Sequence, residues 1–458
     1  MKIIKGGVLV TPDGSFLGDI AVENGKIARV APGIAPESGD EVIDASRCMV
    51  FPGFIDAHTH FDMDNGVTLT ADDFASGTAA ALAGGTTTIV DFATQDKGGT
   101  LRDALDAWHK KAEGKSSCNY AFHMAITDWN ERTRAELDEM VRAGVTSFKL
   151  YMAYDALRVD DAQILDVLTQ MRRIGGVVGV HCENGTLVNA LCARERAAGH
   201  MGPDAHPRSR PGEVEAEAIS RLLYISRLAA HPVNIVHLSS ALGLEEVKKA
   251  RANGQKVFVE TCPQYLLLDE SNYRREGFEG AKYVCSPPLR AAQDMDALCE
   301  AVQTGQIDTI ATDHCSFNYD GQKTLGRDDF TKIPNGAPGV EHRPELIYSY
   351  FVARERITPG DMCALLSENV AKLFGMYPQK GALRVGSDAD IVVWEKGIHS
   401  LIHAQTQLQN VDYTPFEGFE ITGRPRHVLL GGEIAVRDSQ ICARGLGRYV
   451  KRARSSWL

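Results

Sequence analysis

The pattern of apolar and polar positions changes twice along the chain. Residues 1 to 50 alternate apolar and polar side chains between glycine turns, as in KIIKGGVLVTPDG and GDIAVENGKIARVAPG. This alternation is typical of short antiparallel strands with one buried face. The same texture returns after Gly381 in GALRVGSDADIVVWEK and HVLLGGEIAVRDSQ. Because each piece is too small to bury a good core, we expect both to form one small β-sandwich domain.

Between these pieces, apolar β-branched runs alternate with helical stretches. Eight runs occur, at residues 49–58, 86–92, 119–126, 147–153, 176–181, 234–239, 256–261 and 308–314. Eight buried strands alternating with helices predict an α/β fold, a parallel (β/α)8 TIM barrel whose active site lies at the C-terminal strand ends. We therefore expect sandwich pieces at 1–50 and 381–440, a barrel at 51–380 and a C-terminal tail at 441–458.

Composition narrows the class of protein and of site. The 458 residues are 44% hydrophobic and 24% charged, which is ordinary for a globular protein. No apolar window is long enough to span a membrane and no signal peptide is present, so we expect a cytoplasmic protein without a membrane partner. A formal charge of -11 argues against nucleic acid as a partner. Ten cysteines occur without a Cys-x-x-Cys pair, so a metal would be held by histidine and carboxylate ligands.

Polar side chains occur near the C-terminal ends of the predicted strands, where apolar residues are the rule. The first strand ends in DAHTH, and a spacing of two puts His58 and His60 on one face of a strand. Later strands carry further candidates in the same place, namely Lys149, His181, His237 and Asp313. Each alone is more simply explained as a hydrogen-bonded core residue. A metal site is the ordinary reason to gather four imidazoles at a barrel mouth.

Lys149 fits such a site only if its charge is removed. Burial lowers the pKa of a lysine, and a neutral amine can combine with carbon dioxide to form a carbamate. The carbamate carries a negative charge and two oxygens, so it could bridge two metals. We therefore treat N6-carboxylysine at Lys149, formed from carbon dioxide or bicarbonate, as a hypothesis.

Two other histidines near the rim are not expected to be ligands. His123 ends the third strand and is interpreted as structural, and His314 points to the face opposite Asp313 if the strand continues. The basic tail from Arg448 to Arg454 is interpreted as a solvated chain end.

Longer motifs extend over essentially the whole chain. DAHTH, SFKLYMAY, VHCENG, VHLSS, SPPLR, ATDHCSF and IPNGAPG together resemble the dihydropyrimidinase and D-hydantoinase (phenylhydantoinase) family of the amidohydrolase superfamily. The resemblance implies a first zinc held by His58, His60, carboxylated Lys149 and Asp313, and a second held by His181, His237 and the Lys149 carbamate. It also implies a homotetramer.

The resemblance assigns three residues to the substrate. Tyr154 would stabilise the oxyanion, and backbone groups of Ser286 and Asn335 would bind the cyclic amide. Two divalent cations that share a water lower its pKa and supply a hydroxide. Asp313 can accept its proton as the hydroxide attacks the ring carbonyl, then deliver it to the leaving amide nitrogen. The expected enzyme is a hydrolase that opens 5-monosubstituted hydantoins and/or 5,6-dihydropyrimidines to N-carbamoyl amino acids.

Individual residues distinguish this family from related members of the amidohydrolase superfamily. Dihydroorotases carry an arginine two residues after the second histidine, and Asp62 stands there instead, which disfavours an anionic substrate. Allantoinases are not expected to combine the YMAY, SPPLR and IPNG segments. A non-catalytic scaffold protein of the same family is disfavoured because all six ligand positions hold competent residues.

The next question is which substituent on the substrate ring the site accepts. The loops expected to receive it contain Phe61, Met63, Tyr151 and Leu157, which would suit an aryl or alkyl substituent. These residues favour a D-hydantoinase type. The alternative is a dihydropyrimidinase that acts on dihydrouracil or dihydrothymine.

Overall fold

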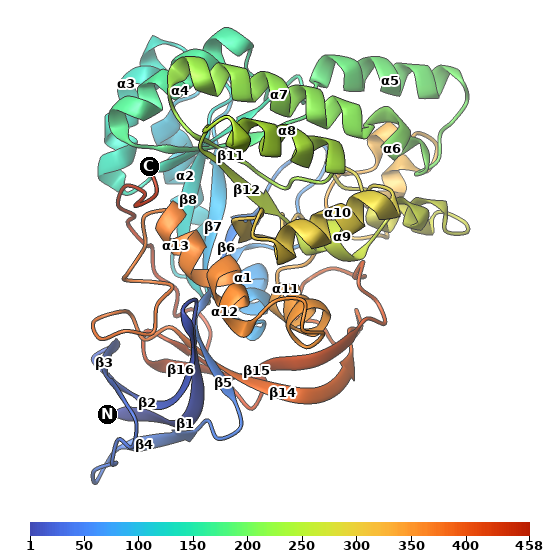
Figure 1. Cartoon of the computed structure of the whole chain (residues 1–458). Coiled ribbons are helices and arrows are strands. Elements are labelled where there is room, and N and C mark those ends of the chain that lie inside the picture. Colours follow the sequence, from blue (N-terminus) through green and yellow to red (C-terminus); the bar gives the residue numbers. More distant parts are fainter.

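The computed structural model describes residues 1–458 and contains two sheets with helices packed around one of them (Figure 1). Eight parallel strands form the first sheet, in the order β13-β12-β11-β10-β9-β8-β7-β6. They are β6 (Phe54–Thr59), β7 (Thr86–Thr94), β8 (Asn119–Ala125), β9 (Ser147–Tyr151), β10 (Val177–His181), β11 (Val233–Ile235), β12 (Val257–Thr261) and β13 (Thr309–Ile310).

The two edges of this sheet meet. A parallel bridge pairs Thr59, at the end of β6, with His314, just beyond β13. The backbone N–H of His60 also donates to the carbonyl of His314 at 2.8 Å. These contacts close the sheet, and the predicted parallel (β/α)8 barrel is confirmed.

Each apolar run contributes one barrel strand, because strands buried on both faces need apolar residues at every position. The first run contributes to both sheets. Its start forms β5 (Met49–Pro52) in the second sheet, and Gly53 separates this strand from β6. A Cβ atom at Gly53 would lie 2.0 Å from Oγ1 of Thr87, so only glycine fits where the chain passes between the sheets.

Helices follow the barrel strands and cover them. They are α1 (Phe74–Ala83), α2 (Leu101–Ala112), α3 (Glu131–Ala143), α4 (Asp161–Ile174), α5 (Gly185–Ala197), α6 (Ala205–Ser209), α7 (Gly212–Ala229), α8 (Ala241–Ala252), α9 (Pro263–Leu267), α10 (Ala292–Gln303), α11 (Arg343–Ile347), α12 (Pro359–Cys363) and α13 (Asn369–Leu373). Short 3-10 turns η1 (Glu270–Arg274), η2 (Glu279–Tyr283), η3 (Lys323–Gly326) and η4 (Phe330–Lys332) lie in the longer loops, and π-helical turns η5 (Tyr348–Val352) and η6 (Ala364–Glu368) follow α11 and α12.

Helix α4 illustrates why these segments are helical. Asp160 and Gln163 form a reciprocal capping box at its start, and Gly175 ends it with a φ of 68°. Ile164, Leu168 and other residues at helical spacing are buried on its inner face. No helix in the structure has both the length and the apolar character needed to cross a membrane.

The second sheet is built from both chain ends. Its nine strands are β1 (Lys2–Thr11), β2 (Gly14–Glu23), β3 (Lys26–Ala31), β4 (Glu41–Asp44), β5, β14 (Ile391–Leu401), β15 (Glu420–Leu430), β16 (Glu433–Arg437) and β17 (Gln440–Ile441). Strand β5 joins the ends, because it pairs parallel with β1 and antiparallel with β14. Hydrogen bonding runs continuously through one mixed sheet, which encloses its own small core of residues such as Ile4, Val50 and Ile391.

The C-terminal residues cross the N-terminal ends of the barrel strands. Tyr449 forms a bridge with Tyr120 at the start of β8, and Trp457 stacks on Phe258 of β12. The guanidinium of Arg452 is buried and donates to Oγ of Ser147 at 2.7 Å and to the carbonyl of Phe122. The prediction that this basic tail is a solvated chain end is therefore wrong for Arg452, whereas Arg448, Lys451 and Arg454 are exposed.

Candidate metal centre

The six side chains predicted as ligands lie at the C-terminal mouth of the barrel. His58 and Lys149 belong to β6 and β9, and His181 is the last residue of β10. His60, His237 and Asp313 follow β6, β11 and β13 in the loops. The C-terminal ends of parallel strands meet at one rim, and this explains how residues far apart in sequence come together.

One group of ligand atoms centres on Asp313. Its Oδ1 lies 3.1 Å from Nε2 of His58 and 3.2 Å from Nε2 of His60. The ligand atoms of these three residues all lie within 4.8 Å of one another. Burial would raise the pKa of Asp313, but the two imidazoles hold it well below its usual range, so the carboxylate is ionised. Two imidazoles and an ionised carboxylate form a donor set suited to a divalent cation.

A second group adjoins the first. Nδ1 of His181 lies 3.0 Å from Nε2 of His237, with the two rings at the ends of neighbouring strands. The ring centre of His237 is 5.3 Å from that of His58. Two imidazole nitrogens that face each other in this way are suited to share one cation. His181 and His237 thus lie beside the group of His58, His60 and Asp313, and a second cation at this pair stays a prediction.

Lys149 is enclosed without a counter-charge. Its side chain is 1% exposed, and no carboxylate lies within 4 Å of its Nζ. The nearest aromatic rings are Phe92 and Tyr151, whose centres lie 5.0 and 5.4 Å from Nζ. Burial lowers the pKa of Lys149 to about 8, against the opposing effect of Asp313 and Glu260. A neutral amine is therefore accessible near neutral pH, as carboxylation requires.

Two glutamates that sequence reasoning missed orient the histidines. Oε1 of Glu260, on β12, lies 2.6 Å from Nδ1 of His58. Oε2 of Glu183 lies 2.7 Å from Nε2 of His181. Each carboxylate binds the ring nitrogen that faces away from the cluster, which fixes the tautomer and the ring orientation. The available signal was an acidic residue within two positions of a strand end, in VFVET and in HCEN.

Glu183 is in turn held by Arg210. The guanidinium donates to Oε2 of Glu183 at 2.5 Å, and both side chains are buried. Burial alone would raise the pKa of Glu183, but Arg210 and His181 lower it to about 2. The same guanidinium lies 5.3 Å from the ring centre of Tyr154. Arg210 therefore contacts both Glu183, which orients the predicted ligand His181, and Tyr154, the predicted oxyanion donor.

Three residues of the site have left-handed backbone conformations. The φ angle is 67° at Tyr154, 40° at His237 and 52° at Asp313. Such conformations cost a non-glycine residue about 1–3 kcal/mol each and are concentrated at functional sites. Each residue lies just beyond a strand, where the positive φ turns the chain out of the strand direction. The strain at this rim thus supports a functional interpretation of the same residues.

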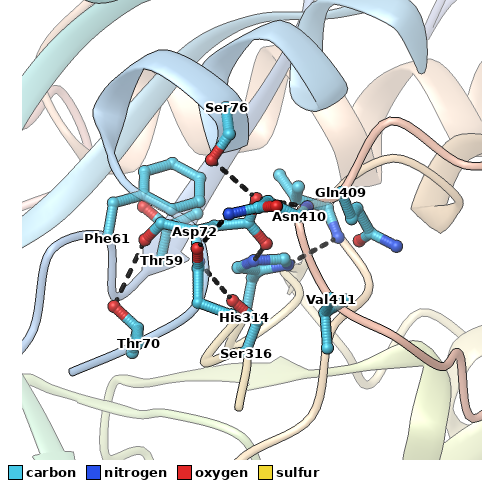
Figure 2. A network of polar contacts seen from close by, with 12 residues as sticks. Thr59, Phe61, Thr70, Asp72, Ser76, His314, Ser316, Gln409, Asn410 and Val411 are labelled. Carbon is cyan, nitrogen blue, oxygen red and sulfur yellow. Dashed lines mark hydrogen bonds and ion pairs between the residues drawn. The ribbon is translucent and has the colours of Figure 1, made fainter. Parts of the chain in front are cut away.

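His314 is turned away from the ligand cluster, as expected. Its Nδ1 accepts backbone N–H groups of Gly339 and Val340 at 3.1 and 3.2 Å, so Nε2 carries the proton. That proton is donated to Oδ2 of Asp72 at 3.0 Å, within the buried network of Figure 2. Asp72 also accepts the backbone N–H of Asn410 at 2.8 Å. The pair connects the loop before α1 to the chain just after Asp313.

His123 has a comparable structural role. Its Nδ1 lies 2.5 Å from Oγ of Ser147, and its Nε2 lies 2.9 Å from the carbonyl oxygen of Ala57. Both ring nitrogens are thus engaged within the barrel. Burial lowers the pKa of His123 well below its usual value, so the ring is neutral.

Two residues of the loop after β6 differ from expectation. Phe61 is 0% exposed and packs between Phe74 and His314, with ring centres 5.7 and 5.3 Å away, so it cannot line an open pocket. Asp62 points its carboxylate to the start of α1, where Oδ2 accepts the N–H of Phe74 at 3.1 Å. The N-terminus of α1 offsets the charge of Asp62. The position therefore offers a substrate neither the arginine of dihydroorotases nor a free carboxylate.

The residues predicted to meet the substrate lie in three rim loops. Tyr154 follows β9, Ser286 lies between η2 and α10, and Asn335 lies between η4 and α11. Desolvation raises the pKa of Tyr154 to about 12, so its hydroxyl remains a hydrogen-bond donor. Oγ of Ser286 is buried and has no hydrogen-bond partner.

Comparison with known proteins identifies the family. The profile of the amidohydrolase family matches residues 49–435. The D-hydantoinase of Geobacillus stearothermophilus is 45% identical over 456 residues, which cover 99% of this chain and 97% of the relative. The chain belongs to the amidohydrolase family, in its hydantoinase and dihydropyrimidinase branch.

Solved structures agree with this assignment. A dihydropyrimidinase from Brevibacillus agri NCHU1002 superposes on this amidohydrolase with a TM-score of 0.97 at 42% identity, covering 99% of both chains. An L-hydantoinase (dihydropyrimidinase) from Arthrobacter aurescens is more distant, with a TM-score of 0.90 and 31% identity over 98% of this chain and 99% of that one. Both sheets of this amidohydrolase thus have counterparts in enzymes with these names.

Proposed function

We propose that this amidohydrolase is a D-hydantoinase, which hydrolyses the ring of 5-monosubstituted hydantoins to N-carbamoyl amino acids. The observation that carries the proposal is the pair of facing ligand groups, His58–His60–Asp313 and His181–His237, beside a buried lysine without a counter-charge. The similarity to the D-hydantoinase of Geobacillus stearothermophilus over nearly the whole chain supports it.

Two divalent cations would be bound by these residues. His58, His60 and Asp313 would hold the first, His181 and His237 the second, and carboxylated Lys149 would bridge them. Carboxylation forms a bond between Nζ of neutral Lys149 and the carbon of carbon dioxide, and one amine proton leaves to solvent. When bound, the cations, most simply Zn²⁺, would supply Lewis-acid activation of water and of the ring carbonyl.

The protein's own groups then have distinct roles. Asp313 would take a proton from the attacking water as the new carbon–oxygen bond forms, and return it to the ring nitrogen as the carbon–nitrogen bond breaks. The protonated hydroxyl of Tyr154 would donate to the developing oxyanion. Backbone groups of Ser286 and Asn335 would hold the amide edge of the ring.

Two observations favour a D-hydantoinase over its neighbours in the family. Identity is 45% to the D-hydantoinase of Geobacillus stearothermophilus and 31% to the L-hydantoinase of Arthrobacter aurescens. Leu157 is partly exposed near Tyr154 and would suit an apolar substituent, whereas Tyr151 is 8% exposed, with its ring centre 6.4 Å from that of Tyr154. Dihydrouracil presents the same amide edge, so dihydropyrimidinase activity is the alternative that a substrate panel must separate.

The deciding experiment is a substrate panel with the purified, zinc-loaded protein. We expect kcat/KM to be highest for D-phenylhydantoin, lower for hydantoin and dihydrouracil, and lowest for L-phenylhydantoin. Elemental analysis should find about two divalent ions per chain, in proportion to the six ligands. A metal-replete protein inert towards all four rings would overturn the proposal. A preference for dihydrouracil would assign the protein to dihydropyrimidine hydrolysis.

We also infer a cytoplasmic homotetramer from the family resemblance. The absence of a membrane-spanning helix is consistent with the location. Sedimentation velocity measures the assembly directly, and a species of about four chain masses is expected. A monomer at micromolar concentration would contradict this inference without bearing on the hydrolase activity.

A further inference from the structure

Lys323 is a second fully buried lysine, outside the ligand groups. It begins the turn η3 and is 0% exposed. Its Nζ donates to three backbone carbonyls, of Val284 at 2.7 Å, Pro334 at 2.6 Å and Gly336 at 2.7 Å. No carboxylate forms an ion pair with it, and these carbonyls are the only hydrogen-bond partners of its Nζ. An ammonium has three donors and no acceptor, so all three donors are used.

The three carbonyls come from two loops. Val284 belongs to the segment that continues into Ser286, and Pro334 and Gly336 flank Asn335 on either side. The loops also touch directly, because the N–H of Gly336 donates to the carbonyl of Val284 at 3.0 Å. Lys323 thus lies at the junction of the two segments whose backbone groups are proposed to hold the substrate.

Gly336 lets the Asn335 loop pack closely against Cys315, in the chain just after Asp313. Its φ is 153°, and a Cβ atom there would lie 2.3 Å from the carbonyl oxygen of Cys315. A side chain is therefore excluded, and the backbone carbonyl can turn towards Nζ of Lys323.

Other contacts anchor the Ser286 loop only to its own side of the barrel. Tyr265 donates its hydroxyl to the carbonyl of Pro287 at 2.7 Å, and Nε2 of His206 lies 2.8 Å from the carbonyl oxygen of Cys285. Neither side chain bonds to the Asn335 loop. Burying a lysine without a counter-charge is costly, and here its side chain adds three hydrogen bonds to the single backbone bond between Gly336 and Val284 that otherwise joins the loops.

We propose that Lys323 is a positioning residue for substrate binding, which fixes the Ser286 loop relative to the Asn335 loop so that both can hold one cyclic amide. This inference rests on the proposed function for the substrate roles of the two loops. Removing the three donors frees each loop to move, and a shift of about 1 Å in groups that bind the substrate can cost on the order of 100-fold in catalytic efficiency.

The test compares Lys323→Met, which keeps the chain length but removes the donors, with the matched control Lys380→Met. Lys380 is also buried, but it pairs with Asp388 and Asp390 beside the chain-end sheet, away from the rim. We expect Lys323→Met to raise KM for hydantoin about tenfold or more, with a smaller change in kcat and unchanged metal content. Lys380→Met is expected to lose stability with KM unchanged.

Hydrogen exchange provides a readout that needs no activity. Peptides covering 284–290 and 333–337 are expected to exchange faster in Lys323→Met and at the wild-type rate in Lys380→Met. If Lys323→Met does not fold, Lys323→Arg, which keeps a cation but moves its donors, is expected to give the same KM rise and the same local exchange. Wild-type KM or wild-type protection of both loops in the folded variant would overturn the proposal. A wild-type protein inert towards all cyclic amides would overturn the proposed function, and the exchange comparison would still decide the role of Lys323 in ordering the loops.

Discussion

Oε1 of Glu260 lies 2.6 Å from Nδ1 of His58, with both side chains 1% exposed. The carboxylate also accepts the backbone N–H of His237 at 3.3 Å. One glutamate on β12 therefore orients an imidazole of the first ligand group and the chain that carries an imidazole of the second. Replacing Glu260 should therefore weaken metal binding more than the loss of an ordinary buried hydrogen bond would.

Glu260→Gln is expected to weaken metal binding by about 10- to 100-fold, because an amide cannot stabilise the His58 tautomer as a carboxylate does. Chelator competition, followed by elemental analysis, measures the change. Glu345→Gln is the matched control, since Glu345 also faces a histidine Nδ1, that of His342 at 3.4 Å, outside the ligand groups. Equal metal retention in the two variants would contradict the orienting role of Glu260.

Tyr154→Phe is expected to lower kcat about 100-fold or more, with metal content unchanged, because one donor to the oxyanion is lost. Steady-state kinetics on hydantoin provide the measurement. Tyr224→Phe is a suitable control, since Tyr224 is 61% exposed on α7. Full activity of Tyr154→Phe would remove Tyr154 from the mechanism.

The buried amine of Lys149 predicts a pH-dependent stability in the metal-free, uncarboxylated protein. Its pKa is about 8 in the folded state, and about 10.4 is usual in an unfolded chain. Between these values the unfolded state binds more protons, so the free energy of unfolding rises with pH, by up to about 1.4 kcal/mol per pH unit. Below pH 8 this group adds no pH dependence, because both states are protonated.

Lys149→Met isolates this contribution, because methionine does not titrate. Denaturant unfolding of both metal-free proteins, measured from pH 7 to 10, should show the wild type gaining stability relative to Lys149→Met above pH 8. Parallel curves would mean that Lys149 is not a desolvated amine. Readdition of zinc with bicarbonate should stabilise the wild type more than Lys149→Met, because the variant keeps His58, His60 and Asp313 but cannot form the carbamate, and bound metal stabilises the folded state.

Arg452→Met should destabilise the fold by about 2 kcal/mol, because the buried oxygens of Ser147 and Phe122 lose a charged donor. Thermal and denaturant unfolding provide the measurement, and Arg454→Met, at an exposed position of the same tail, is the control. Equal stability of the two variants would show that the guanidinium of Arg452 contributes nothing beyond packing.

The sequence predicted the barrel, and the convergence of the six candidate side chains at its mouth, for a physical reason. Strands buried on both faces leave continuous apolar runs, and a polar residue at the end of such a run is conspicuous. His58, His181 and Asp313 were found in this way. Even β11, with only three residues, was located, because its apolar run continues past the strand end at Ile235 to His237, whose φ is left-handed.

The features that were missed depend on contacts distant in sequence. Glu260 orients a histidine 202 residues away, which no local pattern indicates. Phe61 seemed available to a substrate, but its direction is set by packing against α1 and His314. Arg452 belongs to a charged stretch that resembles a solvated end, and only its pairing with the N-terminal ends of β8 and β9 buries it.

The pairing of β5 with β14 constrains how the chain can fold during synthesis. Phe51 of β5 pairs with Val392 of β14. One edge of β5 therefore stays unpaired until β14 leaves the ribosome, after the whole barrel has been synthesised. The N-terminal end of the barrel is covered later still, because the residues that cover it, Tyr449 and Trp457, are close to the C-terminus. A nascent chain without β14 thus exposes an unpaired strand edge, and one lacking only its final segment still exposes an apolar barrel end. Chaperones bind such surfaces, which also promote aggregation.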